Sequence, residues 1–221
     1  MSPAFMDRSE PRCGLCQRLH PPFEKAVAYG SYDGGLRDLI HLLKYQQVRP
    51  AAAVLGRMLA EVVTGLENAM PPGTIAVVAV PLHLRKRAQR GFNQSDLVAR
   101  AALKQLARPE RFQELTNMLV RRRETESQIG LTRHQRRENL RGAFAVVDAE
   151  RLAKRDVLLV DDFFTTGTTV SECARVLRRA GATRVWVATV ARTLKVSEVF
   201  AVPEQEPEEE SMDRLAAAAN G

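Results

Sequence analysis

Apolar and polar residues alternate along the chain in blocks that predict strands and helices in turn. Almost uninterrupted apolar runs, typical of strands buried on both faces of a sheet, occupy 74–80, 157–160 and 185–190. Less regular strands are predicted at 26–32, 115–120 and 143–147. Apolar residues recur at helical spacing over 36–43, 50–66, 93–106 and 170–180. Because strands and helices alternate, we expect an α/β fold with a parallel sheet flanked by helices.

The two ends of the chain differ from this alternating middle. Residues 1–25 hold four prolines and few apolar positions, which predicts a short, loosely packed lead-in containing Cys13 and Cys16. Residues 203–221 carry six acids and one base, a composition typical of a flexible, disordered acidic tail. One folded domain is therefore predicted over 26–202.

The composition is typical of a soluble globular protein, since 45% of the 221 residues are hydrophobic and 27% are charged. No apolar run approaches the roughly 20 residues that cross a bilayer, and no leader-like segment opens the chain. We therefore expect neither export nor a membrane anchor. Three cysteines without framework spacing argue against a disulfide-stapled secreted domain, so the predicted location is the reducing cytoplasm.

The net charge of +7 predicts an anionic partner, which leaves nucleic acid, a membrane surface and a phosphorylated small molecule as alternatives. The acidic tail contributes −5, so residues 1–202 carry +12. Two segments hold much of this excess: four cations lie within 85–90, and seven arginines against three glutamates lie within 121–141. The charge alone does not choose among the three partners.

The most informative stretch is 157–169. Four apolar residues are followed by Asp161 and Asp162, at the carboxyl end of a predicted strand, where open α/β sheets bind their ligands. Thr165, Thr166, Gly167, Thr168 and Thr169 then open the next helix. A helix start with free backbone N–H groups and hydroxyls favours a phosphate, while the two carboxylates accept hydrogen bonds from sugar hydroxyls. A helix N-cap would explain only one of the two acids.

The two basic segments are expected near this site. The first is a loop after the strand at 74–80, and it lies at the same sheet edge as the aspartates if the strands are parallel. The alternative is a solvated basic helix entry. The second segment, 121–141, is too long and basic for a tight connection and is predicted to be a lid or binding loop. Arginine-rich segments also bind nucleic-acid backbones, so that interpretation stays open.

Residues 157–169 resemble the phosphoribosyl pyrophosphate (PRPP) binding motif of the type I phosphoribosyltransferases. The whole order of blocks resembles the ComF competence-protein family, a branch of that superfamily associated with DNA uptake, over about residues 13–192. The matching blocks are Leu43-Lys44-Tyr45, Val80-Pro81, Arg90-Gly91-Phe92-Asn93-Gln94, Gln128 with Leu131, Arg137-x-Asn139-Leu140 and Asp161-Asp162. Thr165 stands where some purine-salvage members have a further aspartate, which argues against that subclass.

The resemblance implies a type I phosphoribosyltransferase-like fold and a set of residue roles. Asp161 and Asp162 would be catalytic and hold the ribose 2′ and 3′ hydroxyls, and Thr165 to Thr169 would cradle the 5′-phosphate. Arg85 and Lys86 would bind the pyrophosphate end. Arg123, Gln128 and Arg137 would belong to a lid loop. Mg²⁺ would bind with PRPP, and the reaction would be pentosyl transfer to an acceptor that no local motif identifies.

One departure from the family concerns zinc. ComF-type chains usually begin with two C-x-x-C pairs that form a zinc finger, and here only Cys13 and Cys16 are present. Tetrahedral structural zinc needs four ligands, and His20 would add at most one more. We therefore expect an incomplete zinc site within one chain, with zinc shared between two chains as an alternative. Cys173 is expected in the core.

Two functions stay open. The first is a phosphoribosyltransferase that binds PRPP or a nucleotide-like ligand. The second is a non-catalytic module that binds single-stranded DNA or a partner in the uptake machinery. Self-association is open in both cases. Lys44 is expected either to reach the pyrophosphate or to lie along the surface with its charge in water.

Overall fold

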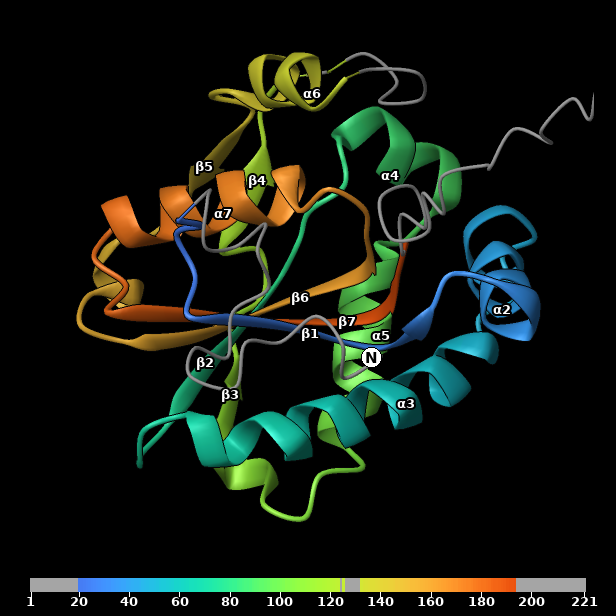
Figure 1. Ribbon diagram of the computed structural model, residues 1–221, viewed down its shortest axis with the longest axis horizontal. Helices are drawn as coiled ribbons and strands as arrows, with labels where there is room; N and C mark the ends of the chain where they lie inside the picture. The colour runs from blue at the N-terminus through green and yellow to red at the C-terminus, as the bar shows by residue number, and fades with distance from the viewer. Residues whose placement is uncertain (1–19, 124, 126–131, 194–221) are drawn as a thin grey trace, which may run out of the picture.

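The computed structural model of the protein describes residues 20–123, 125 and 132–193. Figure 1 shows its helices, which are α2 (Gly34–Tyr45), α3 (Ala51–Leu66), α4 (Leu84–Arg90), α5 (Gln94–Leu103), α6 (Arg133–Leu140) and α7 (Thr168–Arg179). Its strands are β1 (Lys25–Ser31), β2 (Ile75–Ala79), β3 (Phe112–Glu114), β4 (Leu119–Arg121), β5 (Phe144–Val146), β6 (Asp156–Phe164) and β7 (Arg184–Arg192). Short 3-10 helices cover Glu67–Ala69, Pro109–Arg111 and Glu150–Leu152.

Five strands form one sheet in the order β1-β7-β6-β2-β3, and every neighbouring pair is parallel. The sequence prediction of an α/β fold with a parallel sheet flanked by helices is confirmed. Because all five strands run the same way, their carboxyl ends meet at one edge. Figure 1 shows β1 leading to α2 at that edge, and only four residues separate the end of β2 from α4.

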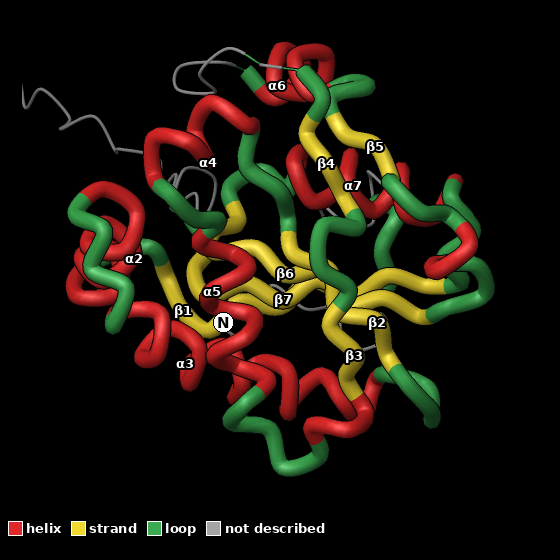
Figure 2. The backbone as a smooth tube through the Cα atoms, turned by 180° about the vertical axis from the view of Figure 1, so that it is seen from behind, coloured by secondary structure: helices red, strands yellow, loops and turns green. Residues whose placement is uncertain are grey.

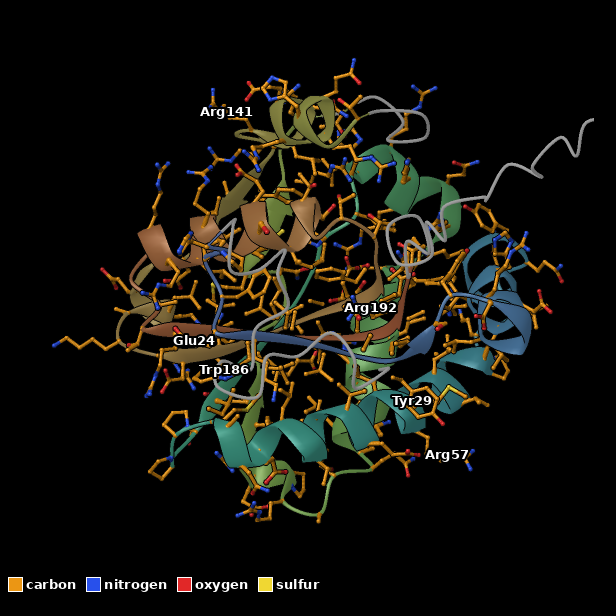
Figure 3. All side chains as sticks on the ribbon, viewed as in Figure 1. Glu24, Tyr29, Arg57, Arg141, Trp186 and Arg192 are labelled. Carbon is orange, nitrogen blue, oxygen red and sulfur yellow. The ribbon has the colours of Figure 1, made fainter. Side chains whose placement is uncertain are left out.

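Helices cover both faces of the sheet. On one face α3 and α5 pack together and contact β7, β6 and β1, with Trp186 buried on the same side (Figure 3). On the other face α7 packs on β6 and β7 and also contacts β5 and α6. Figure 2 shows the antiparallel β4–β5 pair standing away from the main sheet, next to α6. Both faces are filled with apolar residues, so ligands have access only at the ends of the strands.

A close approach fixes the position of α5 on its face. A Cβ atom at Gly56 of α3 would lie 2.4 Å from the Cβ of Ala101 in α5 and 2.9 Å from the Ala101 backbone. Only glycine leaves room for this contact. Since the site described below depends on the first turn of α5, a glycine in α3 helps to place it.

The structure corrects three sequence predictions. The strand expected at 115–120 is mostly absent, since residues 115–118 connect β3 to β4 and only 119 and 120 lie in a strand. Asn117 adopts a left-handed φ of 54° and turns the chain there. Residues 84–90 form the exposed helix α4 and not the expected loop. This agrees with the alternative prediction of a solvated basic helix entry. The strand at 157–160 continues to Phe164, so both aspartates lie within β6 instead of after it.

Several predictions fall outside the described residues. These are the lead-in with Cys13 and Cys16, the acidic tail and Gln128, so the domain bounds and the zinc site stay predictions. Cys173 is buried, as expected, and Trp186 is buried as well. Of the helices in the described part of the chain, none combines the length and apolar character needed to cross a membrane.

Candidate functional site: an acid pair at the carboxyl edge of the sheet

Two aspartates lie side by side where β6 emerges from the core. Val157 to Val160 are fully enclosed between the helical layers, and the last of them pairs with Ala79 at the end of β2. Asp161 and Asp162 therefore extend beyond β2, at the carboxyl edge of the sheet. They are only 8% and 3% exposed, so every carboxylate oxygen needs a partner from the protein or a ligand.

The partners of the acid pair come from three elements. The Ser95 hydroxyl donates to Asp161 Oδ1 over 3.1 Å, and so does the backbone N–H of Asp162 over 3.0 Å. The Gln94 amide donates to Asp162 Oδ1 over 3.2 Å. Lys44, in the last turn of α2, forms an ion pair with Asp162 Oδ2. The first turn of α5 and the end of α2 thus close over the aspartates.

The block from Arg90 to Gln94 explains how α5 comes to begin at this point. Gly91 ends α4 in the left-handed region, with φ of 75°. Asn93 then caps α5 by accepting from the backbone N–H of Ser95 over 3.3 Å, and its amide donates to the carbonyl of Val80 over 3.0 Å. The start of α5 is therefore tied to the end of β2, which directs Gln94 and Ser95 at the acids.

The two aspartates have opposite pKa shifts. Burial raises the pKa of Asp161 to about 8, and the negative charge of Asp162 acts in the same direction. Burial also favours the neutral form of Asp162, but the charge and hydrogen bond of Lys44 outweigh it and lower the pKa. For Lys44, burial is likewise outweighed by Asp162, so the pKa is raised. At neutral pH the pair carries one negative charge, which Lys44 balances.

A hydroxyl-rich turn follows the acid pair and opens α7. Residues 165–167 form the bend, and the helix begins at Thr168. Gly167 has φ of 73°, and a Cβ there would lie 2.6 Å from the Phe164 ring, so the turn requires glycine. The hydroxyls of Thr166 and Thr168 lie 2.7 Å apart. Hydroxyl donors and the positive end of a twelve-residue helix thus gather within a few residues of the acids.

The structure places the other candidate residues on the elements around this edge. Arg85 and Lys86 are exposed on α4, and Arg137 is exposed on α6. Arg123 donates to the carbonyls of Asn139 and Arg141 over 2.7 and 3.2 Å, so it ties the end of β4 to the end of α6. A parallel β-bridge between His83 and Arg121 joins the start of α4 to the end of β4, and so brings the two basic segments close together.

Comparison with known proteins shows the family to which this chain belongs. The phosphoribosyl transferase domain family matches residues 97–210. The DNA utilization protein YhgH of Escherichia coli K12 is 36% identical over 188 residues, which is 82% of this chain and 78% of that protein. Competence protein F of Haemophilus influenzae is 34% identical over 185 residues, which is 81% of this chain and 78% of that protein. The chain belongs to the ComF-type phosphoribosyltransferase family.

Solved structures similar to the ComF-type chain include larger enzymes. One is the glutamine PRPP amidotransferase from B. subtilis complexed with ADP and GMP, at 26% identity and a TM-score of 0.39. Another is described as an allosteric regulatory enzyme of purine biosynthesis, at 23% identity and a TM-score of 0.41. Each match covers 64% of the ComF-type chain but 26% of the solved chain. The ComF-type chain thus spans about a quarter of these proteins.

Three contacts of the acid pair in this ComF-type chain were not predicted from the sequence. Lys44 was expected to reach the pyrophosphate or to lie along the surface. In the structure its amine pairs with Asp162 instead. Gln94 and Ser95 had no assigned role. The signal for them was Asn93, since an N-cap residue two positions after a helix-ending glycine marks where the next helix starts. The order of the strands in the sheet decides which acids the start of that helix contacts.

A metal ion needs several ligating side chains close together. The described residues of the ComF-type chain contain no group of three or more His, Cys, Asp or Glu side chains arranged to hold a metal. Asp161 and Asp162 are two carboxylates, and Asp161 Oδ1 and both oxygens of Asp162 already have protein partners. The donor set therefore does not form a magnesium site from side chains alone, although Mg²⁺ commonly uses one or two carboxylates together with substrate phosphates.

Proposed function

We propose that this protein binds PRPP, or a related ribose phosphate, at the carboxyl edge of the sheet and transfers the phosphoribosyl group to an acceptor. The observation that carries the proposal is the adjacency of the buried acid pair to the threonine-rich start of α7. Carboxylates that accept from ribose hydroxyls, beside donors for a 5′-phosphate, match the two ends of one sugar phosphate. Few other small ligands need carboxylate acceptors and phosphate-binding donors from residues so close together in the chain.

In the proposed complex each group has one task. Asp161 and Asp162 accept hydrogen bonds from the ribose 2′ and 3′ hydroxyls, in place of part of their present contacts with Gln94, Ser95 and Lys44. The turn from Thr165 to Thr169 holds the 5′-phosphate through backbone N–H groups and hydroxyls. Arg85 and Lys86 on α4 attract the pyrophosphate, and Arg123, Gln128 and Arg137 belong to the segment proposed to cover it.

The transfer itself relies on orientation and charge more than on covalent chemistry of the protein. The acceptor forms a bond to the anomeric carbon, the bond from that carbon to the pyrophosphate oxygen breaks, and pyrophosphate leaves with the electron pair. The acceptor's proton passes to water. We propose Mg²⁺ as the cofactor. The pyrophosphate oxygens of PRPP would hold it, since the side chains alone do not form its site, and it would offset the negative charge of the pyrophosphate.

Replacing both aspartates should abolish this binding. We expect the Asp161→Asn/Asp162→Asn variant to bind PRPP with Mg²⁺ about 100-fold more weakly. The variant loses the charge of the acid pair, and a hydrogen bond to a charged acceptor contributes about 1.5–3 kcal/mol. Isothermal titration calorimetry measures the change. Asp156→Asn is the matched control, since Asp156 lies at the opposite end of β6, where it pairs with Arg184 over 2.9 Å. Equal affinity in the double variant and the unaltered protein would refute the proposal.

We further propose a role in the handling of DNA during uptake in the cytoplasm. The support is the pair of relatives named DNA utilization protein and competence protein, together with the basic surface of α4 and α6. The second candidate function is therefore a non-catalytic module that binds single-stranded DNA. Arg85 and Lys86 are exposed on α4, Arg137 is exposed on α6, and Arg141 is exposed directly after α6 (Figure 3 labels Arg141). In the proposed complex the phosphates of DNA would contact this surface.

A salt series separates this second function from the first. We expect labelled single-stranded DNA to bind at low salt and to lose affinity steeply as salt rises, because phosphate contacts release counterions. Replacing Arg141 with Gln should weaken DNA binding and reduce the salt slope, while PRPP binding through the acid pair persists. Fluorescence anisotropy measures both. No binding of DNA even at low salt would exclude the direct contact.

A further inference from the structure

A groove lies beside the last turns of α7, at the amino ends of the strands. The backbone N–H of Glu24 donates to the carbonyl of Val185 over 2.8 Å, which places residues 21–24 next to the start of β7. The last turns of α7 form the other side of the groove, which has a volume of about 440 Å³. Figure 3 labels Glu24 and Arg192 toward opposite ends of the sheet. The groove is therefore remote from the carboxyl edge and its acid pair.

The residues that line this groove are of two kinds. Three apolar residues precede β1 and three arginines lie on α7, namely Pro21, Pro22 and Phe23 with Arg175, Arg178 and Arg179. Glu24 is the acid of the lining, so three positive charges and one negative charge give +2. Arg178 and Arg179 are exposed, and Pro21 and Pro22 are half-buried. The groove thus offers cations beside the apolar surface of prolines.

Contacts within the protein use only part of this charge. Arg175 pairs with Glu172 one turn earlier on α7, and Arg178 donates to the carbonyl of Thr183. Arg178 also lies 3.8 Å from the Glu24 carboxylate, and such exposed pairs contribute little. Cations near the end of a helix interact favourably with its dipole, but this effect is small at exposed positions. With Glu24 and Glu172 both counted, three arginines against two acids still leave a net charge of +1.

The acidic tail, residues 203–221, has a composition that complements the groove. It carries six acids and one base, and Pro203 and Pro207 lie among the glutamates of 204–210. Residues 1–19 carry three bases and two acids, so their charge does not complement the groove. Both segments lie outside the described residues. Carboxylates form charge-assisted hydrogen bonds with arginine, and prolines bury apolar surface against other apolar residues.

The chain between the sheet and the tail is long enough to reach the groove. Thr193 lies at the carboxyl edge, where its backbone N–H donates to the carbonyl of Phe164 over 2.9 Å. Val185 lies eight positions earlier, which is about 26 Å at the rise of a strand. Residues 194–203 span up to about 33–36 Å when extended. The first glutamates of the tail can therefore reach the arginines of α7.

We infer that the groove beside α7 binds the acidic tail of the same chain. Glutamates within 204–210 pair with the three arginines, and the prolines of the tail pack on the apolar lining. Docking holds six acids at the opposite end of the sheet from the site proposed to bind anionic ligands, so the tail does not repel those ligands. The inference does not depend on the proposed function, because the groove shares no residue with the acid pair or the turn after it.

Proteolysis of the full chain measures the docking. A glutamyl endopeptidase cleaves after Glu210 only while the tail is undocked, so the cleavage rate follows the undocked population. The protection factor is the cleavage rate of a synthetic peptide of residues 194–221 divided by that of the full chain. We expect a protection factor of about five or more at low salt, because tethering gives the tail a high local concentration. At about 0.5 M salt it should fall below about two, because salt screens exposed charges. Mass spectrometry of the products gives both rates.

Two charge reversals assign the protection to a surface. Arg179→Glu reverses one cation of the groove and should reduce the protection factor about threefold or more. Arg141→Glu is the matched control, because Arg141 is also an exposed arginine but lies directly after α6, on the alternative basic surface at the carboxyl edge. It should leave the protection factor unchanged. Arg179→Glu combined with Glu208→Arg and Glu209→Arg should restore the protection, measured against a peptide with the same two replacements.

Each outcome supports the inference or overturns it. A protection factor near one in the unaltered chain overturns it, and so do equal losses in Arg179→Glu and Arg141→Glu. A loss in Arg141→Glu alone would assign the tail to the surface of α4 and α6, which also overturns it. If the charge swap does not restore protection, a damaged end of α7 is the cause and the inference is wrong. A loss in Arg179→Glu that the swap reverses, with protection kept in Arg141→Glu, is the supporting result. These measurements involve neither PRPP nor DNA, so they leave the proposed function untouched.

Discussion

The Lys44→Met variant should have a free energy of unfolding about 3 kcal/mol lower than the unaltered protein, because it leaves the Asp162 carboxylate buried without its counter-ion. The side chains of Lys44 and Asp162 are only 15% and 5% exposed, so water replaces little of the lost attraction. Methionine keeps most of the volume and the apolar contact with Phe163. Urea unfolding followed by circular dichroism measures the loss.

A second variant distinguishes the lost charge from lost packing. Lys44→Met/Asp162→Asn removes both charges, and we expect it to recover most of the stability, since neutral replacements of a buried ion pair are often tolerated. Arg100→Met is the surface control, because Arg100 pairs with Glu114 while 51% exposed and should cost at most about 1 kcal/mol. If the double variant is no more stable than Lys44→Met, packing rather than charge is the cause.

Stability should fall as the pH rises from about 5.5 to about 7.5, with a slope approaching about 1.4 kcal/mol per pH unit. The cause is Asp161, whose pKa burial raises from its ordinary value of 3.8 to about 8. Between these two values the folded protein holds a proton that the unfolded chain does not hold. The stability from this proton is fully present below about pH 4 and is lost as the pH rises through about 8.

The Asp161→Asn variant tests this assignment. An amide resembles the protonated carboxyl in shape, and its oxygen still accepts from Ser95 and from the backbone N–H of Asp162. We expect the variant to lack the slope and to be more stable than the unaltered protein at about pH 8. The opposing shift at Asp162, where Lys44 lowers the pKa, acts only at acidic pH. An unchanged slope in Asp161→Asn would assign the pH dependence to another group.

Both predictions depend on one property of the site. Its two carboxyl groups are buried, although their charged forms are more stable in water. A buried pair of carboxylates is costly, and the chain offsets that cost with Lys44, Gln94 and Ser95. Ribose hydroxyls would supply donors of the same kind. The groups that stabilise the empty site are therefore those that a bound sugar would replace, which links ligand affinity to stability.

The parallel sheet and most of its helices were predictable from local patterns. Buried strands such as 157–160 and 185–190 are apolar at nearly every position, because both of their faces are covered, and that pattern needs no knowledge of the fold. The acid pair and the threonine-rich turn were also found, since the motif lies within thirteen consecutive residues. Helix α4 was missed because it has no buried residue and hence no apolar periodicity.

Contacts between segments far apart in the sequence could not be predicted from local patterns. Lys44 and Asp162 are separated by more than half the chain, and they meet because β1, β7 and β6 are neighbours in the sheet and α2 follows β1. The contact between the Tyr32 and Phe163 rings has the same origin, since Tyr32 follows β1, Phe163 lies near the end of β6, and both strands pair with β7. The order of residues was enough to identify the chemistry of the acid motif, because its residues are contiguous. Its ionisation, its partners and the ring contact beside it arose only on folding, because charge and packing depend on distances in space.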